Sequence, residues 1–180
     1  MDEDLWYRDS YRIPSTRRCG WDYGDPGSYF ITICTKGRVP WFGNIQHGFV
    51  CLSDIGSIVY EYWNEIPIHF AHVTIDRFVV MPNHVHGIVR INDRAIVETC
   101  ESHVSTTATI PRPMPGSLGS IIGQFKSFVT KRVRIIDPEF AWQTRFHDNI
   151  IRNHRAMVRI RRYITRNPME WNQEHISNEV

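Results

Sequence analysis

The chain has 180 residues, a formal net charge of +2, 42% hydrophobic residues and 12% aromatic residues. This length and composition suit a single domain built around one core. No apolar run approaches the ~20 residues needed to cross a bilayer, and the acidic start from Met1 to Asp4 lacks the features of a secretory signal. We therefore exclude an integral membrane protein and expect a cytoplasmic one.

The charge is spread unevenly along the chain. Residues 121–167 contain eleven Lys or Arg against three Asp or Glu, a local balance of +8, which leaves −6 for the remainder. A basic segment on a near-neutral protein is typical of proteins that bind a polyanion such as nucleic acid. A solvated charged surface explains the same composition equally well.

The first third of the chain predicts an arm, a strand and a helix. Residues 1–27 are polar, are interrupted by glycine and proline, and mix arginines with aromatic residues. Such an irregular arm could hold nucleic acid through phosphate contacts and base stacking, or could pack across the domain surface. Residues 28–35 are β-branched and aromatic and predict the first strand. Ser53 is expected to cap a helix that Pro67 ends.

The middle of the chain predicts a hairpin, a long loop and a second helix. Residues 73–81 and 84–92 read as two strands joined by a tight Pro-Asn turn. Residues 93–116 are polar and proline-containing, and predict a long, mobile loop. Ser117 is expected to cap the second helix, whose polar side carries Lys126 and Lys131.

The end of the chain predicts a short fourth strand within residues 140–151 and a last helix. This helix is expected to begin after Asn153 and to end near Asn167, because Pro168 follows. The order β-α-β-β-α-β plus a final helix predicts an α+β, ferredoxin-like split β-α-β fold, with an antiparallel sheet, helices on one face and an added C-terminal helix. We assign residues 28–172 to this domain and residues 173–180 to a C-terminal tail.

Two histidines begin the strand predicted over residues 84–92. Side chains alternate between the faces of a strand, so His84 and His86 share one face. Two imidazoles held two residues apart on a rigid strand form a pre-aligned pair of metal ligands. A pair of partly buried, hydrogen-bonded histidines without a metal is the alternative interpretation.

The last helix carries a tyrosine at the border of two different faces. At ~100° per residue, Tyr163 lies between an apolar face and a stripe of arginines, with Asn167 one turn later. We call this stripe the arginine ridge; it consists of Arg155, Arg159, Arg162 and Arg166. Like charges on one stripe repel unless an anion balances them, so the ridge predicts phosphate contacts. A tyrosine in such a place is also typical of an amphipathic anchor.

Residues 80–87, Val-Met-Pro-Asn-His-Val-His-Gly, resemble the His-hydrophobic-His motif of the single-tyrosine HUH transposases. The resemblance is greatest to the branch called REP-associated tyrosine transposases. It extends from residues 29–35 through Trp142-Gln143 and residues 149–153 to the segment that starts with Tyr163-Ile164 and ends with Asn167-Pro168.

The resemblance implies specific roles. His84 and His86 would bind a divalent metal, Mg²⁺ or Mn²⁺, with Asn167 as a third ligand, and Tyr163 would be the nucleophile. The activity implied is cleavage and rejoining of single-stranded DNA near small hairpins through a 5′-phosphotyrosine intermediate, with a homodimer as in some relatives. The basic residues that we expect to contact DNA are Arg155, Arg159, Arg162, Arg166, Lys126 and Lys131.

Other classes of protein remain open on the sequence. A domesticated transposase would bind DNA hairpins without cutting them, and the His-His-Tyr set does not distinguish it from the enzyme. A ferredoxin-like RNA-binding module would carry exposed aromatic residues on its central strands, where this sequence has histidines. A zinc hydrolase is disfavoured, because no third histidine or acidic ligand stands at an obvious spacing.

Overall fold

The computed structural model describes residues 24–93 and 115–176, with side chains described up to residue 171. Most of the predicted arm, most of the predicted long loop and the end of the tail lie outside the described residues. Among the described residues, no helix combines the length and apolar character needed to span a membrane.

Four strands form one antiparallel sheet in the order β4-β5-β1-β6. The strands are β1 (Gly27–Cys34), β4 (Val73–Met81), β5 (His84–Ile91) and β6 (His147–Ile151). The predicted strands at residues 28–35, 73–81 and 84–92 are confirmed to within one residue at each end. Strand β1 pairs with β5 along its whole length and with β6 on its other side, so the two central strands are β5 and β1.

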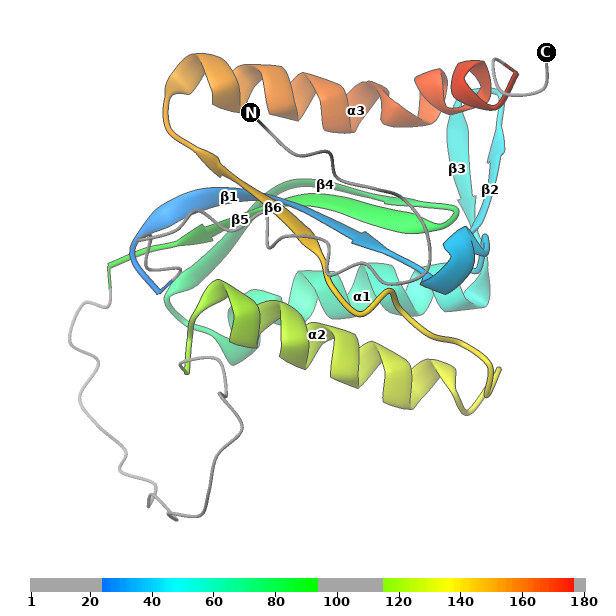
Figure 1. The fold of residues 1–180 in the computed structure, drawn as a ribbon, viewed down its shortest axis with the longest axis horizontal. Coiled ribbons are helices and arrows are strands. Elements are labelled where there is room, and N and C mark those ends of the chain that lie inside the picture. The colour runs from blue at the N-terminus through cyan, green and yellow to red at the C-terminus, as the bar shows by residue number, and fades with distance from the viewer. Residues whose placement is uncertain (1–23, 94–114, 177–180) are drawn as a thin grey trace, which may run out of the picture.

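Helices cover both faces of this sheet. Helices α1 (Asp54–His69) and α2 (Leu118–Val133) lie together on one face, and α3 (His154–Ile176) crosses the other, as Figure 1 shows. This arrangement confirms the α+β, ferredoxin-like fold with an added C-terminal helix. The two faces of the sheet are called below the α1/α2 face and the α3 face.

The predicted helix starts are confirmed by their capping bonds. The Ser53 hydroxyl accepts a hydrogen bond from the Gly56 amide at 3.0 Å, and Ser117 caps α2 in the same way. The Asn153 side-chain oxygen accepts from the Ala156 amide at 2.8 Å. Each cap satisfies an amide that the first turn of a helix leaves without a partner.

The predicted helix ends at proline are wrong. Helix α1 includes Pro67 and ends at His69, and α3 includes Pro168 and continues to Ile176. A proline inside a helix removes one backbone hydrogen bond, a cost that tertiary packing can offset. The extra turns of α3 contact a two-stranded sheet that was not predicted from the sequence.

This second sheet is formed by β2 (Gly43–Gln46) and β3 (Phe49–Leu52). The β2–β3 hairpin stands at one end of the main sheet and reaches the C-terminal end of α3 (Figure 1). Gly48 in its turn has a φ of +79°, and a Cβ there would lie 3.3 Å from the Met169 side chain. The hairpin therefore packs directly against the segment of α3 that follows Pro168.

The two faces of the sheet bury apolar residues to different extents. On the α1/α2 face a large core surrounds the fully buried Trp63 and includes Val85 and Val89 of β5. On the α3 face the buried apolar cluster consists of Ile88, Ile151 and Ile164, with a few half-buried neighbours. Helix α3 is thus held by a small apolar contact, which leaves room for polar groups beside it.

Candidate functional site

His84 and His86 begin β5 on the α3 face and are 5% and 6% exposed. Their ring centroids lie 4.4 Å apart, which confirms that they share one face. Across the sheet, His86 is the register partner of Thr32 in β1, and its Nδ1 lies 2.9 Å from the Thr32 hydroxyl. The pair is therefore fixed by two central strands.

A short hydrogen-bond chain determines the tautomer of His84. The Asn83 side-chain amide donates from Nδ2 to the Arg38 carbonyl oxygen at 3.1 Å, so its Oδ1 faces His84. His84 Nδ1 lies 2.8 Å from that oxygen and must carry the proton that it donates. His84 Nε2 therefore keeps its lone pair, as a metal-ligating nitrogen requires.

Both imidazoles are held in the neutral form. Burial, followed by the positive charges that His86 and Arg38 can carry, lowers the pKa of His84 to about 3. Burial, followed by the charge of Arg38, lowers the pKa of His86 to about 4. The neutral imidazole is the form that binds metals.

Tyr163 lies over this pair. Its phenol oxygen is 3.2 Å from His86 Nε2, and the Phe30 ring packs edge-on against Tyr163 and stacks on His86. The neighbouring Ile164 is 1% exposed and anchors α3 to the sheet, while Tyr163 is 41% exposed. The structure thus brings a solvent-accessible phenol to the histidine pair within a single chain.

The site surrounds a cavity of about 190 Å³. Its lining residues come from four parts of the fold and are Thr32, Arg38, His84, His86, Tyr163, Asn167, Glu170 and Trp171. The side-chain oxygen of Asn167 is buried and has no hydrogen-bond partner among the described residues. Buried polar atoms are rarely left without a partner, and this oxygen can accept a ligand that enters the cavity.

These residues fit the divalent metal that the resemblance implies. Among the described residues no group of three His, Cys, Asp or Glu side chains could hold a metal. The candidate set instead joins two neutral imidazoles, His84 and His86, to the orphaned amide oxygen of Asn167. Amide oxygens are ordinary ligands for hard divalent cations. Imidazole nitrogens bind transition metals, and their affinity for Mn²⁺ is lower than their affinity for zinc or copper.

Four residues of the cavity were not predicted from the sequence: Thr32, Arg38, Glu170 and Trp171. Glu170 and Trp171 lie beyond the proline at which we ended the helix, and the Trp171 ring centroid is 5.5 Å from that of His84. They follow Asn167 by three and four residues, so the helical spacing that joins Tyr163 to Asn167 would have included them. Arg38 lies in a turn with no such periodic signal.

The basic residues predicted to contact DNA fall on opposite faces of the molecule. All four residues of the arginine ridge are exposed on α3, the helix that carries Tyr163. Lys126 and Lys131 belong to α2, across the sheet (Figure 1). Lys126 Nζ donates to the carbonyl oxygens of Gln143 and Thr144, and burial lowers its pKa. The structure does not bring these two lysines to the cavity.

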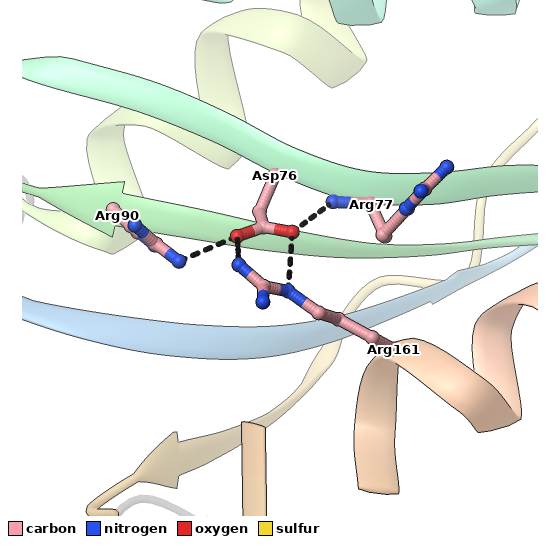
Figure 2. Close-up of polar contacts among 4 residues, drawn as sticks. All are labelled: Asp76, Arg77, Arg90 and Arg161. Carbon is pink, nitrogen blue, oxygen red and sulfur yellow. Dashed lines mark hydrogen bonds and ion pairs between the residues drawn. The ribbon is translucent and has the colours of Figure 1, made fainter. Parts of the chain in front are cut away.

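An ionic network fastens α3 to the sheet near Tyr163. In β4 the pairing register shifts between Ile75 and Phe78, so Asp76 and Arg77 together stand opposite one residue of β5. Such a bulge re-aims side chains. Asp76 accepts hydrogen bonds from Arg161 Nε at 2.9 Å and Nη2 at 2.5 Å, and from Arg90 at 2.5 Å (Figure 2). The hydrogen bonds from Arg161 hold the pKa of Asp76 below its usual range.

Comparison with solved structures shows which class of fold this is. The structure of a REP-associated tyrosine transposase bound to a REP hairpin matches 88% of this chain and 74% of its own, with a TM-score of 0.57 and 17% identity. A candidate transposase from Deinococcus radiodurans matches 83% of this chain and 95% of its own at 13% identity, but its TM-score of 0.47 is too low to add to the argument. The chain therefore has the fold of the tyrosine transposases.

The sequence comparisons add a relative. A Haemophilus influenzae protein described as uncharacterized is 37% identical over 166 residues, which span 90% of this chain and 91% of the relative. The chain belongs to the same family as this protein. No family model matches the chain.

Proposed function

We propose that this protein is a metal-dependent single-stranded DNA transesterase of the REP-associated tyrosine transposase branch, which cleaves and rejoins DNA beside hairpins through a 5′-phosphotyrosine intermediate. The observation that carries the proposal is the 3.2 Å approach of the Tyr163 phenol to His86, in a cavity shared with His84 and Asn167. The REP hairpin bound to the structural neighbour supports hairpin DNA as the partner.

The reaction consists of two transesterifications. In the first, the Tyr163 phenol loses its proton and its oxygen attacks the scissile phosphorus. The bond from phosphorus to the 3′ oxygen breaks, and that oxygen leaves as a 3′-hydroxyl after taking a proton. The 5′ phosphate remains esterified to Tyr163. In the second, a 3′-hydroxyl attacks the same phosphorus and releases the phenol, so rejoining needs no nucleotide cofactor.

The chain's own residues prepare this attack. The divalent ion held by His84, His86 and Asn167 would supply Lewis-acid polarisation of a phosphate oxygen. Asn83 orients His84, burial keeps both histidines neutral, and the buried Ile164 fixes the helix that presents Tyr163. The Tyr163 phenol oxygen lies within hydrogen-bond distance of His86 Nε2, so a hydrogen bond there and a metal at the same nitrogen would exclude each other.

Cleavage of labelled DNA by Tyr163→Phe protein tests the proposal. The substrate is a hairpin-containing single strand labelled on the 3′ side of the cut and incubated with Mn²⁺. Wild-type protein is expected to produce a slowly migrating covalent adduct on a denaturing gel. Tyr163→Phe removes one oxygen and should abolish both cleavage and adduct while hairpin binding persists. Tyr60→Phe, at a 48% exposed tyrosine on α1, is the matched control and should cleave normally.

Two outcomes would contradict the proposal. A wild-type protein that binds the hairpin and never cuts it, at any concentration of Mn²⁺ or Mg²⁺, is a hairpin-binding protein without catalytic activity. A Tyr163→Phe variant that still cuts uses water or another side chain as its nucleophile.

A further inference from the structure

The turn that follows β1 carries an arginine to the cavity through an unusual backbone conformation. This turn is the short 3-10 helix η1 (Lys36–Arg38). Gly37 and Arg38 have φ values of +65° and +58°. A left-handed conformation is common for glycine, but it is costly for a residue with a Cβ and persists only where surrounding contacts impose it.

The contacts that impose it come from Thr35, just after β1, and from Asn83 in the turn between β4 and β5. The Arg38 amide donates to the Thr35 carbonyl oxygen at 3.2 Å, and the Arg38 carbonyl oxygen accepts from Asn83 Nδ2 at 3.1 Å. The Thr35 amide donates to the Asn83 carbonyl oxygen at 2.9 Å, and the buried Thr35 hydroxyl lies 2.8 Å from the Val39 carbonyl oxygen and 3.0 Å from that of Asn83. Asn83 therefore orients His84 and holds the backbone of Arg38 at the same time.

The charge of Arg38 is not balanced within the described part of the chain. Its side chain is exposed and lines the cavity beside His84, His86 and Tyr163, and no described carboxylate forms an ion pair with it. Glu170 lines the same cavity without reaching ion-pair distance. A guanidinium presents a planar fork of donors that matches two oxygens of one phosphate.

We propose that Arg38 binds the scissile phosphate and stabilises the negative charge that develops on its non-bridging oxygens as Tyr163 attacks. This inference rests on the proposed function, since it assigns Arg38 to the same reaction. Donors already aimed at developing charge lower the barrier without reorganising during the reaction. A turn held in a costly conformation by Thr35 and Asn83 meets that requirement.

Arg38 differs from the arginine ridge in the effect that its loss should have. The ridge residues are exposed along α3 and do not line the cavity, so they would act on DNA affinity. Arg38 would act on the rate of the chemical step. Lysine keeps the charge but cannot form the two-pronged contact, so Arg38→Lys should recover only part of the rate.

The test compares Arg38→Asn and Arg38→Lys with Arg132→Ala, which removes an exposed arginine of α2 on the other face of the molecule. Asparagine tolerates the left-handed conformation, so Arg38→Asn removes the charge without straining the turn. Single-turnover cleavage by Arg38→Asn should be slower by roughly 100-fold to 1000-fold. Hairpin affinity should change little, and Arg132→Ala should match the wild type. An Arg38→Asn protein that cleaves at the wild-type rate overturns the inference.

A second measurement separates failure of this inference from failure of the proposed function. Dimethyl phosphate is titrated while the Trp171 indole N–H resonance, a reporter in the same cavity, is followed in the wild type and in Arg38→Asn. We expect a saturable shift in the wild type that is lost in the variant. If the wild type cuts no DNA, the proposed function fails, and this titration still decides whether Arg38 binds a phosphodiester. Equal shifts in both proteins overturn that role.

Discussion

Strand β5 belongs to two different environments at once. Val85, Gly87 and Val89 face α1 and α2 across a large apolar core, whereas His84 and His86 face α3 beside a cavity. Successive residues of one strand therefore serve opposite purposes. The α1/α2 face is closed by apolar packing and stabilises the domain, and the α3 face keeps polar groups in place at the expense of buried apolar contact.

Local detail on each face supports this contrast. On the α1/α2 face a Cβ at Gly87 would lie 2.3 Å from the Trp63 ring, so the packing leaves no space for one methyl group. On the α3 face the buried oxygen of Asn167 has no hydrogen-bond partner in the described part of the chain, and Arg38 has a positive φ. Violations of ordinary packing and backbone preferences are expected at functional sites, where other contacts compensate for them.

The largest effect on stability is expected from Gly87→Ala. The added methyl must displace the fully buried Trp63, which should lower the free energy of unfolding by roughly 3 kcal/mol. Gly123→Ala on α2 is the matched control, since nothing lies within 4 Å of a Cβ there. It should raise stability by about 0.5–1 kcal/mol through helix propensity. Urea denaturation checks both, and equal stability of the two variants would contradict the tight packing of this face.

The next effect concerns metal binding on the α3 face. The double variant His84→Ala, His86→Ala should lose measurable Mn²⁺ binding in calorimetric titration while it remains folded. Asn83→Ala, which removes the group that orients His84, should weaken binding by roughly 10-fold to 100-fold. His69→Ala, at an exposed histidine of α1, should bind as the wild type does. Undiminished Mn²⁺ binding by the double variant would contradict the assignment of a metal site to His84 and His86.

The ionic network on the α3 face predicts a smaller, pH-dependent effect. Because the folded state lowers the pKa of Asp76, its carboxylate stabilises the fold above the ordinary pKa of about 4 and loses that contribution as the pH falls through the folded value. Asp76→Asn should therefore lower the melting temperature by roughly 3 °C at neutral pH. The difference from the wild type should shrink below about pH 4. A difference that stays constant down to pH 2 would show that Asp76 contributes without its charge.

The smallest effect is expected from the arginine ridge. If its residues contact phosphates, each neutralised arginine should reduce the slope of log affinity against log salt concentration by roughly 0.7 for single-stranded DNA. Arg155→Ala and Arg162→Ala together should reduce it by twice that amount, and Arg132→Ala on α2 should leave it unchanged. Fluorescence anisotropy at several salt concentrations measures the slope. An unchanged slope in the double variant would make the ridge a solvated surface.

Much of this organisation could be predicted from the sequence because it depends on local periodicity. Alternation along a strand places His84 and His86 on one face, and helical spacing places Tyr163 between an apolar stripe and the arginine ridge. Capping residues marked the helix starts at Ser53, Ser117 and Asn153. Each of these features involves residues close together in the chain, so the pattern that predicts it is contained in a short segment.

Other features were decided only by contacts between distant segments. The β2–β3 hairpin packs against the part of α3 that follows Pro168. Because the helix continues through this proline, Glu170 and Trp171 reach the cavity. Lys126 appeared available to DNA from its place on the helix, but the carbonyl groups of Gln143 and Thr144 bind its ammonium group. Arg38 reaches the site because Asn83, 45 residues away, holds its backbone. Local spacing carries no information about such partners, since they are determined by how the sheet and helices pack in three dimensions.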